Sequence, residues 1–226
     1  IAKEKGPCDY FKKTKYSKGI LPIDTYKKDV DDIVGNRLKL DWEKLREEVL
    51  KHGMRHSTLS AQMPSESSSV VGNATNGIEP PRAYLSVKKS KKGPLKQIVP
   101  QYKTLKEYYT LLWDMPSNEG YINIVAVMQK YFDQAISGNW SYNPLKFDNN
   151  EVPMSILTKD FLTTYKMGWK TSYYQNTYDF KGEEPNITDN ENTLTVDEAL
   201  KQQPMQRAEF KGSDEEYEEY CDSCSI

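Results

Sequence analysis

The sequence has 226 residues, of which 37% are hydrophobic and 28% are charged, so it can bury one substantial core. Its net charge of −2 gives no sign of the broad basic face typical of nucleic-acid binding. The longest apolar run, residues 121–128, is too short to span a bilayer, and the first residues lack the pattern of a signal peptide. We therefore expect a cytoplasmic chain with neither a nucleic-acid nor a membrane partner. Because residue 1 is Ile, we expect that the chain begins mid-sequence or has been processed.

The first half of the chain carries signals for one helix and one hairpin. Asp41 is a good N-cap for a helix whose apolar residues recur at helical spacing: Trp42, Leu45, Val49 and Leu50. A Ser-rich stretch, residues 64–77, follows. Residues 83–87 and 95–99 flank a basic linker with Gly93 and Pro94, which predicts a hairpin.

The second half predicts three helices and one strand. The helices cover residues 104–115, 120–137 and 155–168, and the first has Thr104 as N-cap with Glu107 at the capping-box position. Residues 169–176 are aromatic and favour a strand. From residue 181 apolar residues are sparse, and residues 209–222 carry seven acids against one Lys. We expect a folded domain over residues 1–180 and a disordered acidic tail over residues 181–226.

Residues 63–69, Met-Pro-Ser-Glu-Ser-Ser-Ser, are a candidate anion site. A strand that ends at Pro64 would present several N–H and O–H donors, and a helix starting there would add its dipole. The alternative is an ordinary Ser-rich N-cap, which spacing alone favours.

Tyr173 and Tyr174 are a candidate pair of redox-active phenols that could exchange an electron and a proton. Against this, aromatic pairs are common in strands, and a regular strand would point the two rings to opposite faces. From the residues alone, a packing role is the simpler interpretation.

The three cysteines, Cys8, Cys221 and Cys224, do not form a disulfide scaffold. Cys221 and Cys224 lie within the last six residues, where a Cys-x-x-Cys pair on a mobile tail could carry reducing equivalents. The acids around them should disfavour the thiolate, which suits a shuttle better than an attacking nucleophile. His52 and His56 have no recognised zinc spacing, so we predict no metal site.

Several ordered motifs resemble the large subunit of class Ia ribonucleotide reductases. They are residues 19–28 (Gly-Ile-Leu-Pro-Ile-Asp-Thr-Tyr-Lys-Lys), 56–68 (His-Ser-Thr-Leu-Ser-Ala-Gln-Met-Pro-Ser-Glu-Ser-Ser), 73–82 (Asn-Ala-Thr-Asn-Gly-Ile-Glu-Pro-Pro-Arg) and 173–177 (Tyr-Tyr-Gln-Asn-Thr). The similarity covers residues 1–177 and resumes at the terminal cysteines. The Cys-x-x-Cys spacing is tighter than in bacterial relatives.

The resemblance implies an α/β fold, the C-terminal portion of a ten-stranded α/β barrel that reduces ribonucleoside diphosphates by a radical mechanism. It implies that substrate phosphates bind at Pro64, Ser65, Glu66, Ser67 and Ser68. It also makes Tyr173 and Tyr174 the last relay of a radical pathway. Cys221 and Cys224 would re-reduce an active-site disulfide.

The implied partners are the upstream part of the large subunit, the small subunit, and thioredoxin or glutaredoxin. We expect no cofactor bound by this chain itself. The oxidant would be the diiron-tyrosyl radical of the small subunit, and the ATP/dNTP effector sites would lie upstream. Because the family's radical-bearing cysteine matches nothing here, the chain should be inactive alone. Two alternatives are a non-catalytic docking module derived from the same subunit and an unrelated thiol-disulfide carrier.

Overall fold

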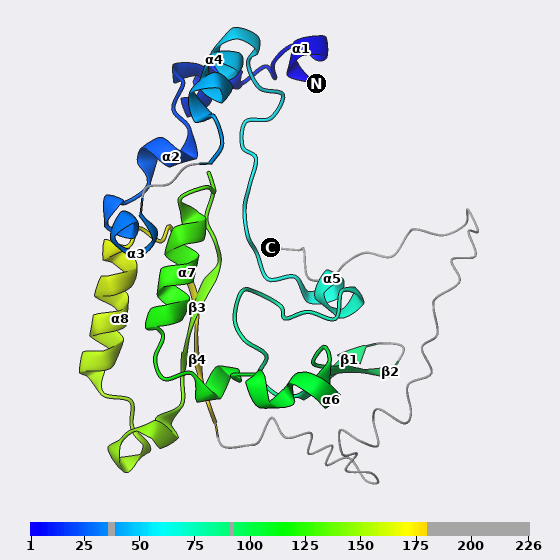
Figure 1. Cartoon of the computed structure of the whole chain (residues 1–226), viewed down its shortest axis with the longest axis vertical. Helices are drawn as coiled ribbons and strands as arrows, with labels where there is room; N and C mark the ends of the chain where they lie inside the picture. The colour runs from blue at the N-terminus through cyan, green and yellow to red at the C-terminus, as the bar shows by residue number, and fades with distance from the viewer. Residues whose placement is uncertain (36–38, 91–92, 180–226) are drawn as a thin grey trace. The chain divides into compact units, whose positions relative to one another are not determined.

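The computed structural model describes residues 1–35, 39–90 and 93–179. Four helices lie in the first part of the chain, α1 (Ala2–Lys5), α2 (Pro22–Thr25), α3 (Asp31–Val34) and α4 (Trp42–His52) (Figure 1). The prediction for α4 is confirmed, because the Asp41 carboxylate accepts a hydrogen bond of 2.9 Å from the backbone N–H of Lys44. This bond satisfies one of the donors that a helix leaves unpaired in its first turn.

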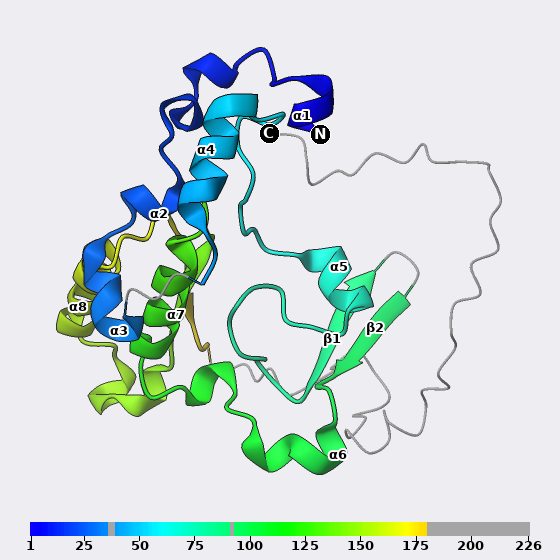
Figure 2. The same ribbon diagram turned by 45° about the horizontal axis from the view of Figure 1, so that its top comes forward.

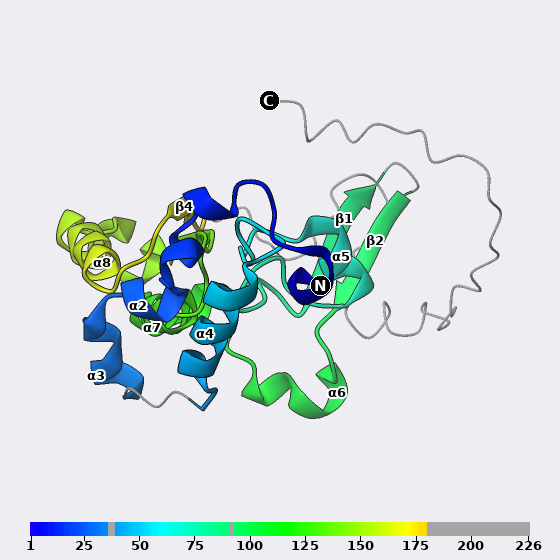
Figure 3. The ribbon, with the colours of Figure 1, turned by 90° about the horizontal axis from the view of Figure 1, so that it is seen from above.

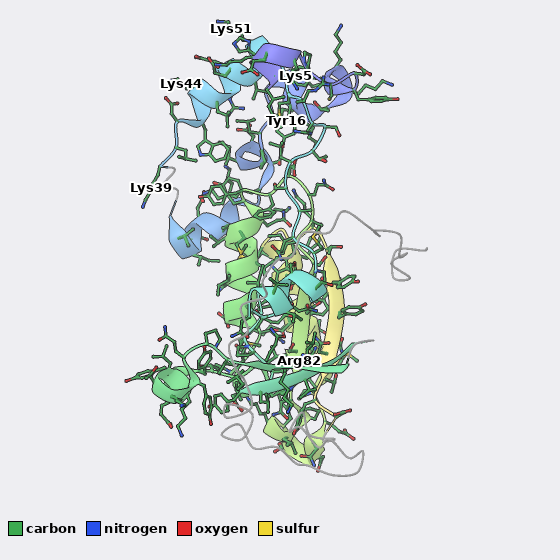
Figure 4. All side chains as sticks on the ribbon, turned by 90° about the vertical axis from the view of Figure 1, so that its right-hand side faces the viewer. Lys5, Tyr16, Lys39, Lys44, Lys51 and Arg82 are labelled. Atoms are coloured by element: carbon green, nitrogen blue, oxygen red, sulfur yellow. The ribbon has the colours of Figure 1, made fainter. Side chains whose placement is uncertain are left out.

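A small hydrophobic core joins α4 to the residues before it. Its buried members are Tyr16, Leu21, Ile23, Val49 and Met54, with Phe11 and Trp42 packed against them. Tyr16 lies beneath the helix that carries Lys44 and Lys51 (Figure 4). The predicted apolar face of α4 is only partly buried, since Val49 belongs to this core while Leu45 and Leu50 are about half exposed.

The predicted hairpin is confirmed, and its strands run further into the basic linker than expected. β1 (Leu85–Ser90) and β2 (Gly93–Ile98) pair antiparallel, from Leu85 opposite Ile98 to Ser90 opposite Gly93. Helix α5 (Glu66–Val71) is tied to this hairpin (Figure 2). Asn73 Nδ2 donates to the Ile98 carbonyl at 3.0 Å, and Gln97 Nε2 donates to the Ser69 carbonyl at 3.2 Å.

The predicted helix over residues 104–115 is wrong. Only α6 (Tyr102–Leu105) is α-helical there, and Thr104 lies inside it rather than at its cap. The α-helix does not continue to residue 115, because Leu112 is buried and its N–H donates to the Pro81 carbonyl at 2.9 Å. In the same region the Arg82 guanidinium (labelled in Figure 4) lies 5.8 Å from the centre of the Trp113 ring.

Helix α7 (Glu119–Gln129) ends eight residues before the end of the predicted helix over residues 120–137. The Gln129 side chain explains where it ends, because its amide bonds the loop that follows. Gln129 Nε2 donates to the Gln134 carbonyl at 2.8 Å, and its Oε1 accepts from the N–H of Ile136 at 3.2 Å. These bonds fold the chain back toward α7, and the next strand begins at Gly138.

The last described elements form a strand–helix–strand unit. β3 (Gly138–Tyr142), α8 (Met154–Lys166) and β4 (Ser172–Thr177) follow in order, and β3 and β4 are parallel neighbours. Sequence analysis predicted α8 and β4 but missed β3. Helices α7 and α8 lie side by side (Figures 1 and 3). A parallel pair joined by a helix is the unit from which α/β folds are built.

A buried hydrogen-bond network holds this unit together. Asp160 of α8 accepts from Asn118 Nδ2 at 2.8 Å and from the Tyr142 hydroxyl at 3.1 Å. Burial, and then the neighbouring Asp160 charge, raise the pKa of Tyr142 well above its usual value. Trp140 Nε1 donates to Thr164 Oγ1 at 3.1 Å, which adds a second tie between β3 and α8.

A further segment, residues 60–62, runs parallel to residues 134–137. The N–H of Gln134 donates to the Ser60 carbonyl at 3.1 Å, and the N–H of Ser137 donates to the Gln62 carbonyl at 2.8 Å. Mixed helices and parallel strands agree with the predicted α/β class. None of the described helices is long and apolar enough to cross a membrane. The predicted boundary at residue 180 stays a prediction, since residues 180–226 are outside the described ranges.

Short 3-10 helices connect these elements. They are Phe11–Lys13, Lys15–Lys18, Lys28–Val30, Lys106–Tyr108, Leu112–Asp114, Pro144–Lys146 and Asp148–Asn150.

Candidate functional site

Tyr173 and Tyr174 of β4 lie on the same side of their strand and touch. Their ring centroids are 4.1 Å apart with an interplanar angle of 53°, and the Tyr174 hydroxyl donates to the Tyr173 oxygen at 3.3 Å. A regular strand would point the two rings to opposite faces, so β4 departs from a regular strand at this point. Both side chains are about half exposed, 48% and 57%. When one of two phenols in direct hydrogen-bond contact is oxidised to a phenoxyl radical, it can take a hydrogen atom from the other.

An irregularity in strand pairing brings the two rings together. Gly138 pairs with Ser172 and Trp140 pairs with Gln175, so one residue of β3 faces two residues of β4. That one residue is Asn139, and the two are Tyr173 and Tyr174. A bulge of this kind bends the strand and re-aims the side chains of the extra residue.

Asn139 supports the bulge with its side chain. Its Oδ1 accepts from the backbone N–H of Tyr174 at 3.1 Å, and its Nδ2 donates to Glu79 Oε1 at 3.3 Å. Asn139 is 9% exposed. The other carboxylate oxygen of Glu79, Oε2, is buried and has no hydrogen-bond partner among the described residues.

Tyr121 of α7 lies behind this cluster. Its hydroxyl accepts from the backbone N–H of Asn139 at 3.3 Å, and its ring meets Trp169 edge-on at 5.7 Å. Burial raises the pKa of Tyr121 to about 12, and the nearby Glu79 charge adds to the shift. Tyr121 therefore stays protonated at neutral pH and serves as a neutral support.

The serine-rich segment starts helix α5, with Ser65 at the N-cap. Ser65 is thus the N-cap that the alternative interpretation expected, although its side chain makes no cap hydrogen bond. The backbone N–H of Ser65 donates a hydrogen bond of 2.7 Å to the Asn76 carbonyl. Ser67 and Ser68 are exposed, and Pro64 is half-buried. By helix geometry, the first-turn N–H groups have no partner within α5.

A short loop links the serine segment to the tyrosine pair. The Asn76 carbonyl binds Ser65, and three residues later Glu79 binds Asn139, which in turn supports Tyr174. Residues 76–79 thus connect the two predicted sites through hydrogen bonds.

The predicted redox pair, Cys221 and Cys224, lies outside the described residues. Cys8 is a free thiol, half-buried, whose backbone N–H donates to the Met54 carbonyl at 2.9 Å. Within the described ranges no group of three or more His, Cys, Asp or Glu side chains could hold a metal ion.

Sequence reasoning missed Asn139 and Glu79. Neither residue belongs to a pattern with a chemical meaning of its own, and Asn139 lies on the strand that was not predicted. The only sequence signal was that Glu79 falls within the family motif over residues 73–82.

Comparisons with known proteins agree on one family. The family model described as "Ribonucleotide reductase, barrel domain" matches residues 1–175. The ribonucleoside-diphosphate reductase subunit alpha of Haemophilus influenzae is 58% identical over 179 residues, and the ribonucleoside-diphosphate reductase 1 subunit alpha of Escherichia coli K12 is 59% identical over 179 residues. The alpha subunit of Enterobacteria phage T4 is 45% identical over 184 residues.

These alignments cover most of this chain but a small part of each relative. They include 79%, 79% and 80% of this chain, and 24% of each of the three relatives. The chain therefore spans about a quarter of the length of the curated relatives that it matches.

Proposed function

The chain belongs to the ribonucleotide reductase barrel-domain family, and on that premise we propose that it acts as the C-terminal part of a ribonucleoside-diphosphate reductase large subunit. In this role it takes part in the radical reduction of ribonucleoside diphosphates to deoxyribonucleoside diphosphates. It does so only together with the remaining part of the subunit, because the chain spans about a quarter of its relatives.

The geometry of Tyr173 and Tyr174 is the observation that carries this proposal. In a relay step between them, the O–H bond of one phenol breaks and an O–H bond forms on the phenoxyl radical of the other, and one electron moves in the same direction as the proton. Each phenol oxygen can both donate and accept, so their 3.3 Å contact serves transfer in either direction. The 57% exposure of Tyr174 suits the arrival of the oxidising equivalent from a partner protein.

We assign the other roles by family membership. Residues 64–68 bind the substrate phosphates, which the position of these residues at the start of α5 and the exposed Ser67 and Ser68 side chains support. Cys221 and Cys224 return electrons from thioredoxin or glutaredoxin to the active site. The oxidant comes from the small subunit with its diiron-tyrosyl radical, and the nucleotide effectors bind elsewhere in the large subunit.

The test is removal of each phenol oxygen in the assembled enzyme. Tyr173→Phe and Tyr174→Phe, measured separately, should abolish deoxynucleotide formation while assembly with the rest of the subunit stays intact. Tyr108→Phe is the matched control, because Tyr108 is 84% exposed and lies on another segment. Full activity of either Tyr173→Phe or Tyr174→Phe would contradict the relay role. Binding of partners without any turnover by the unmodified chain in the assembled enzyme would instead support the docking-module alternative.

A further inference from the structure

One buried side chain, Asn139, opposes both tyrosines across the bulge. We propose that Asn139 is a positioning residue for the tyrosine relay, acting through the Tyr174 backbone to keep both phenols on one side of β4. The proposal rests on the relay role assigned above and deepens it. Asn139 contacts no reacting oxygen in the structure, so it is not a catalytic residue.

The backbone of the bulge provides the first argument. A bulge leaves an extra residue outside the regular ladder, and the N–H groups there need another acceptor. The N–H of Tyr174 finds it in Asn139 Oδ1 at 3.1 Å. In the bulged register, Gly138 pairs with Ser172 and Trp140 pairs with Gln175. Without Asn139 Oδ1 as acceptor, this register would lose a hydrogen bond that a regular ladder does not contain.

The orientation of the Asn139 amide provides the second argument. Glu79 Oε1 is a carboxylate oxygen and accepts hydrogen bonds, so the amide group that faces it at 3.3 Å must be Nδ2. This leaves Oδ1 facing the N–H of Tyr174. The Tyr121 hydroxyl also accepts from the backbone N–H of Asn139, so main chain and side chain are both held. A buried amide with one allowed orientation is a rigid support.

The expected effect on the relay follows from distance. Loss of the acceptor should let β4 return to a regular strand, in which neighbouring side chains point to opposite faces. The phenol oxygens would then separate from 3.3 Å to a distance without a hydrogen bond. Misplacement of reacting groups by about 1 Å costs on the order of 100-fold in rate, so we expect a loss of about that size in Asn139→Ala.

A fluorine NMR measurement tests the geometry without any turnover. With 3-fluorotyrosine at position 174 of the full chain in its assembled form, Tyr173→Leu should change the fluorine chemical shift, because the neighbouring ring is lost. In the Asn139→Ala background the same Tyr173→Leu change should have little effect. An undiminished response in Asn139→Ala would overturn the proposal.

Asn118→Ala is the control for a loss of stability alone. Asn118 is also buried and makes the same kind of contacts, with Nδ2 on Asp160 at 2.8 Å and Oδ1 accepting from the N–H of Ser141 at 3.0 Å. It should destabilise the same strand–helix–strand unit but preserve the fluorine response to Tyr173→Leu. Equal loss of the response in both variants would reduce Asn139 to a structural residue.

Asn139→Asp supplies a rescue with a pH profile. Asn139 contacts the titratable residues Glu79 and Tyr121, and it faces Tyr173 and Tyr174 of β4. At low pH the introduced carboxyl can share a proton with Glu79, so that one oxygen donates to Glu79 while the other accepts from Tyr174. At higher pH two carboxylates repel each other. Turnover of Asn139→Asp relative to the unmodified enzyme should therefore rise as the pH falls, and a flat ratio would contradict the proposal.

The two proposals fail in different ways. If the relay role is wrong, Tyr173→Phe and Tyr174→Phe keep their activity whatever Asn139 does to the fluorine response. If only the positioning role is wrong, both Phe variants are inactive while Asn139→Ala keeps both turnover and the fluorine response.

Discussion

The Tyr16 hydroxyl donates a hydrogen bond of 2.7 Å to Asp133 Oδ2, across 117 positions of the sequence. The same carboxylate accepts from the backbone N–H groups of Leu59 at 2.6 Å and Ser60 at 2.9 Å, and from the Ser60 hydroxyl at 3.2 Å. Lys170 Nζ donates to the Asp133 carbonyl at 2.7 Å. Asp133 therefore joins the N-terminal segment, the chain before the serine segment and the residues that precede β4.

We predict that Asp133 makes the fold sensitive to acid. Burial by itself would raise the pKa of Asp133, but hydrogen bonds from Ser60, Tyr16 and Leu59 together hold it below its usual value of 3.8. A carboxyl with a lowered folded-state pKa stabilises the fold above its unfolded pKa, and this contribution is lost as the pH falls through the folded pKa. Urea unfolding should thus show a loss of stability below about pH 4 to which Asp133 contributes.

Asp133→Asn should remove this part of the pH dependence and destabilise the fold at pH 7. The new NH₂ group would face N–H donors, and the expected cost is about 1–3 kcal/mol. Glu151→Gln, at an exposed carboxylate, is the control and should leave stability unchanged. The same acid sensitivity in Asp133→Asn as in the unmodified chain would contradict the assignment.

Gly138→Ala should destabilise the strand–helix–strand unit. A Cβ at Gly138 would overlap the ring of Trp169, which packs against the first residue of β3. Overpacking of this kind costs about 1–3 kcal/mol, which thermal unfolding can measure. Gly120→Ala is a control of opposite sign. Gly120 lies in α7 with open space around it, so Ala should stabilise the helix by about 0.5–1 kcal/mol.

Local sequence signals predicted the elements that depend on local bonds. The cap at Asp41 and the pattern that follows it predicted α4, and α8 was predicted within two residues. The prediction of a helix over residues 104–115 was wrong because burial of Leu112 and its hydrogen bond to Pro81 outweigh helix propensity. The predicted C-terminal end of α7 was wrong because one side chain, Gln129, hydrogen-bonds the loop that follows and redirects the chain.

The site was predicted by residue type but not by geometry. Tyr173 and Tyr174 stood out as adjacent phenols, but their common orientation depends on the register between β4 and β3. Since β3 was not predicted, neither the bulge nor the role of Asn139 could follow from the sequence. Pairing between distant strands is set by tertiary packing, which periodicity does not report.

Ser65→Ala combined with Ser67→Ala should weaken substrate diphosphate binding in the assembled enzyme. Each hydrogen bond to a charged oxygen contributes about 1.5–3 kcal/mol, so each lost bond should raise the dissociation constant roughly 10- to 150-fold. Equilibrium binding of a ribonucleoside diphosphate measures this. Ser86→Ala, at an exposed position of β1, is the control. Unchanged affinity of the double variant would remove phosphate binding from these serines.

Cys221→Ser combined with Cys224→Ser should abolish multiple turnover supported by thioredoxin. A single turnover should remain, because the active-site thiols begin reduced, and a small dithiol that reaches the site directly should restore much of the activity. Cys8→Ser is the control, since Cys8 is a half-buried free thiol. Full activity of the double variant with thioredoxin as the only reductant would show that the terminal cysteines are incidental.

The 117-residue span between Tyr16 and Asp133 also bears on how the chain folds during synthesis. At about 5–20 residues per second, a ribosome reaches Asp133 roughly 6–23 s after Tyr16. The core of Tyr16, Leu21, Ile23, Val49 and Met54 is complete much earlier, because all its members lie within residues 16–54. During synthesis, the segment that contains residues 16–54 can therefore pack its own apolar residues first. The hydrogen bond from the Tyr16 hydroxyl to Asp133 can form only later.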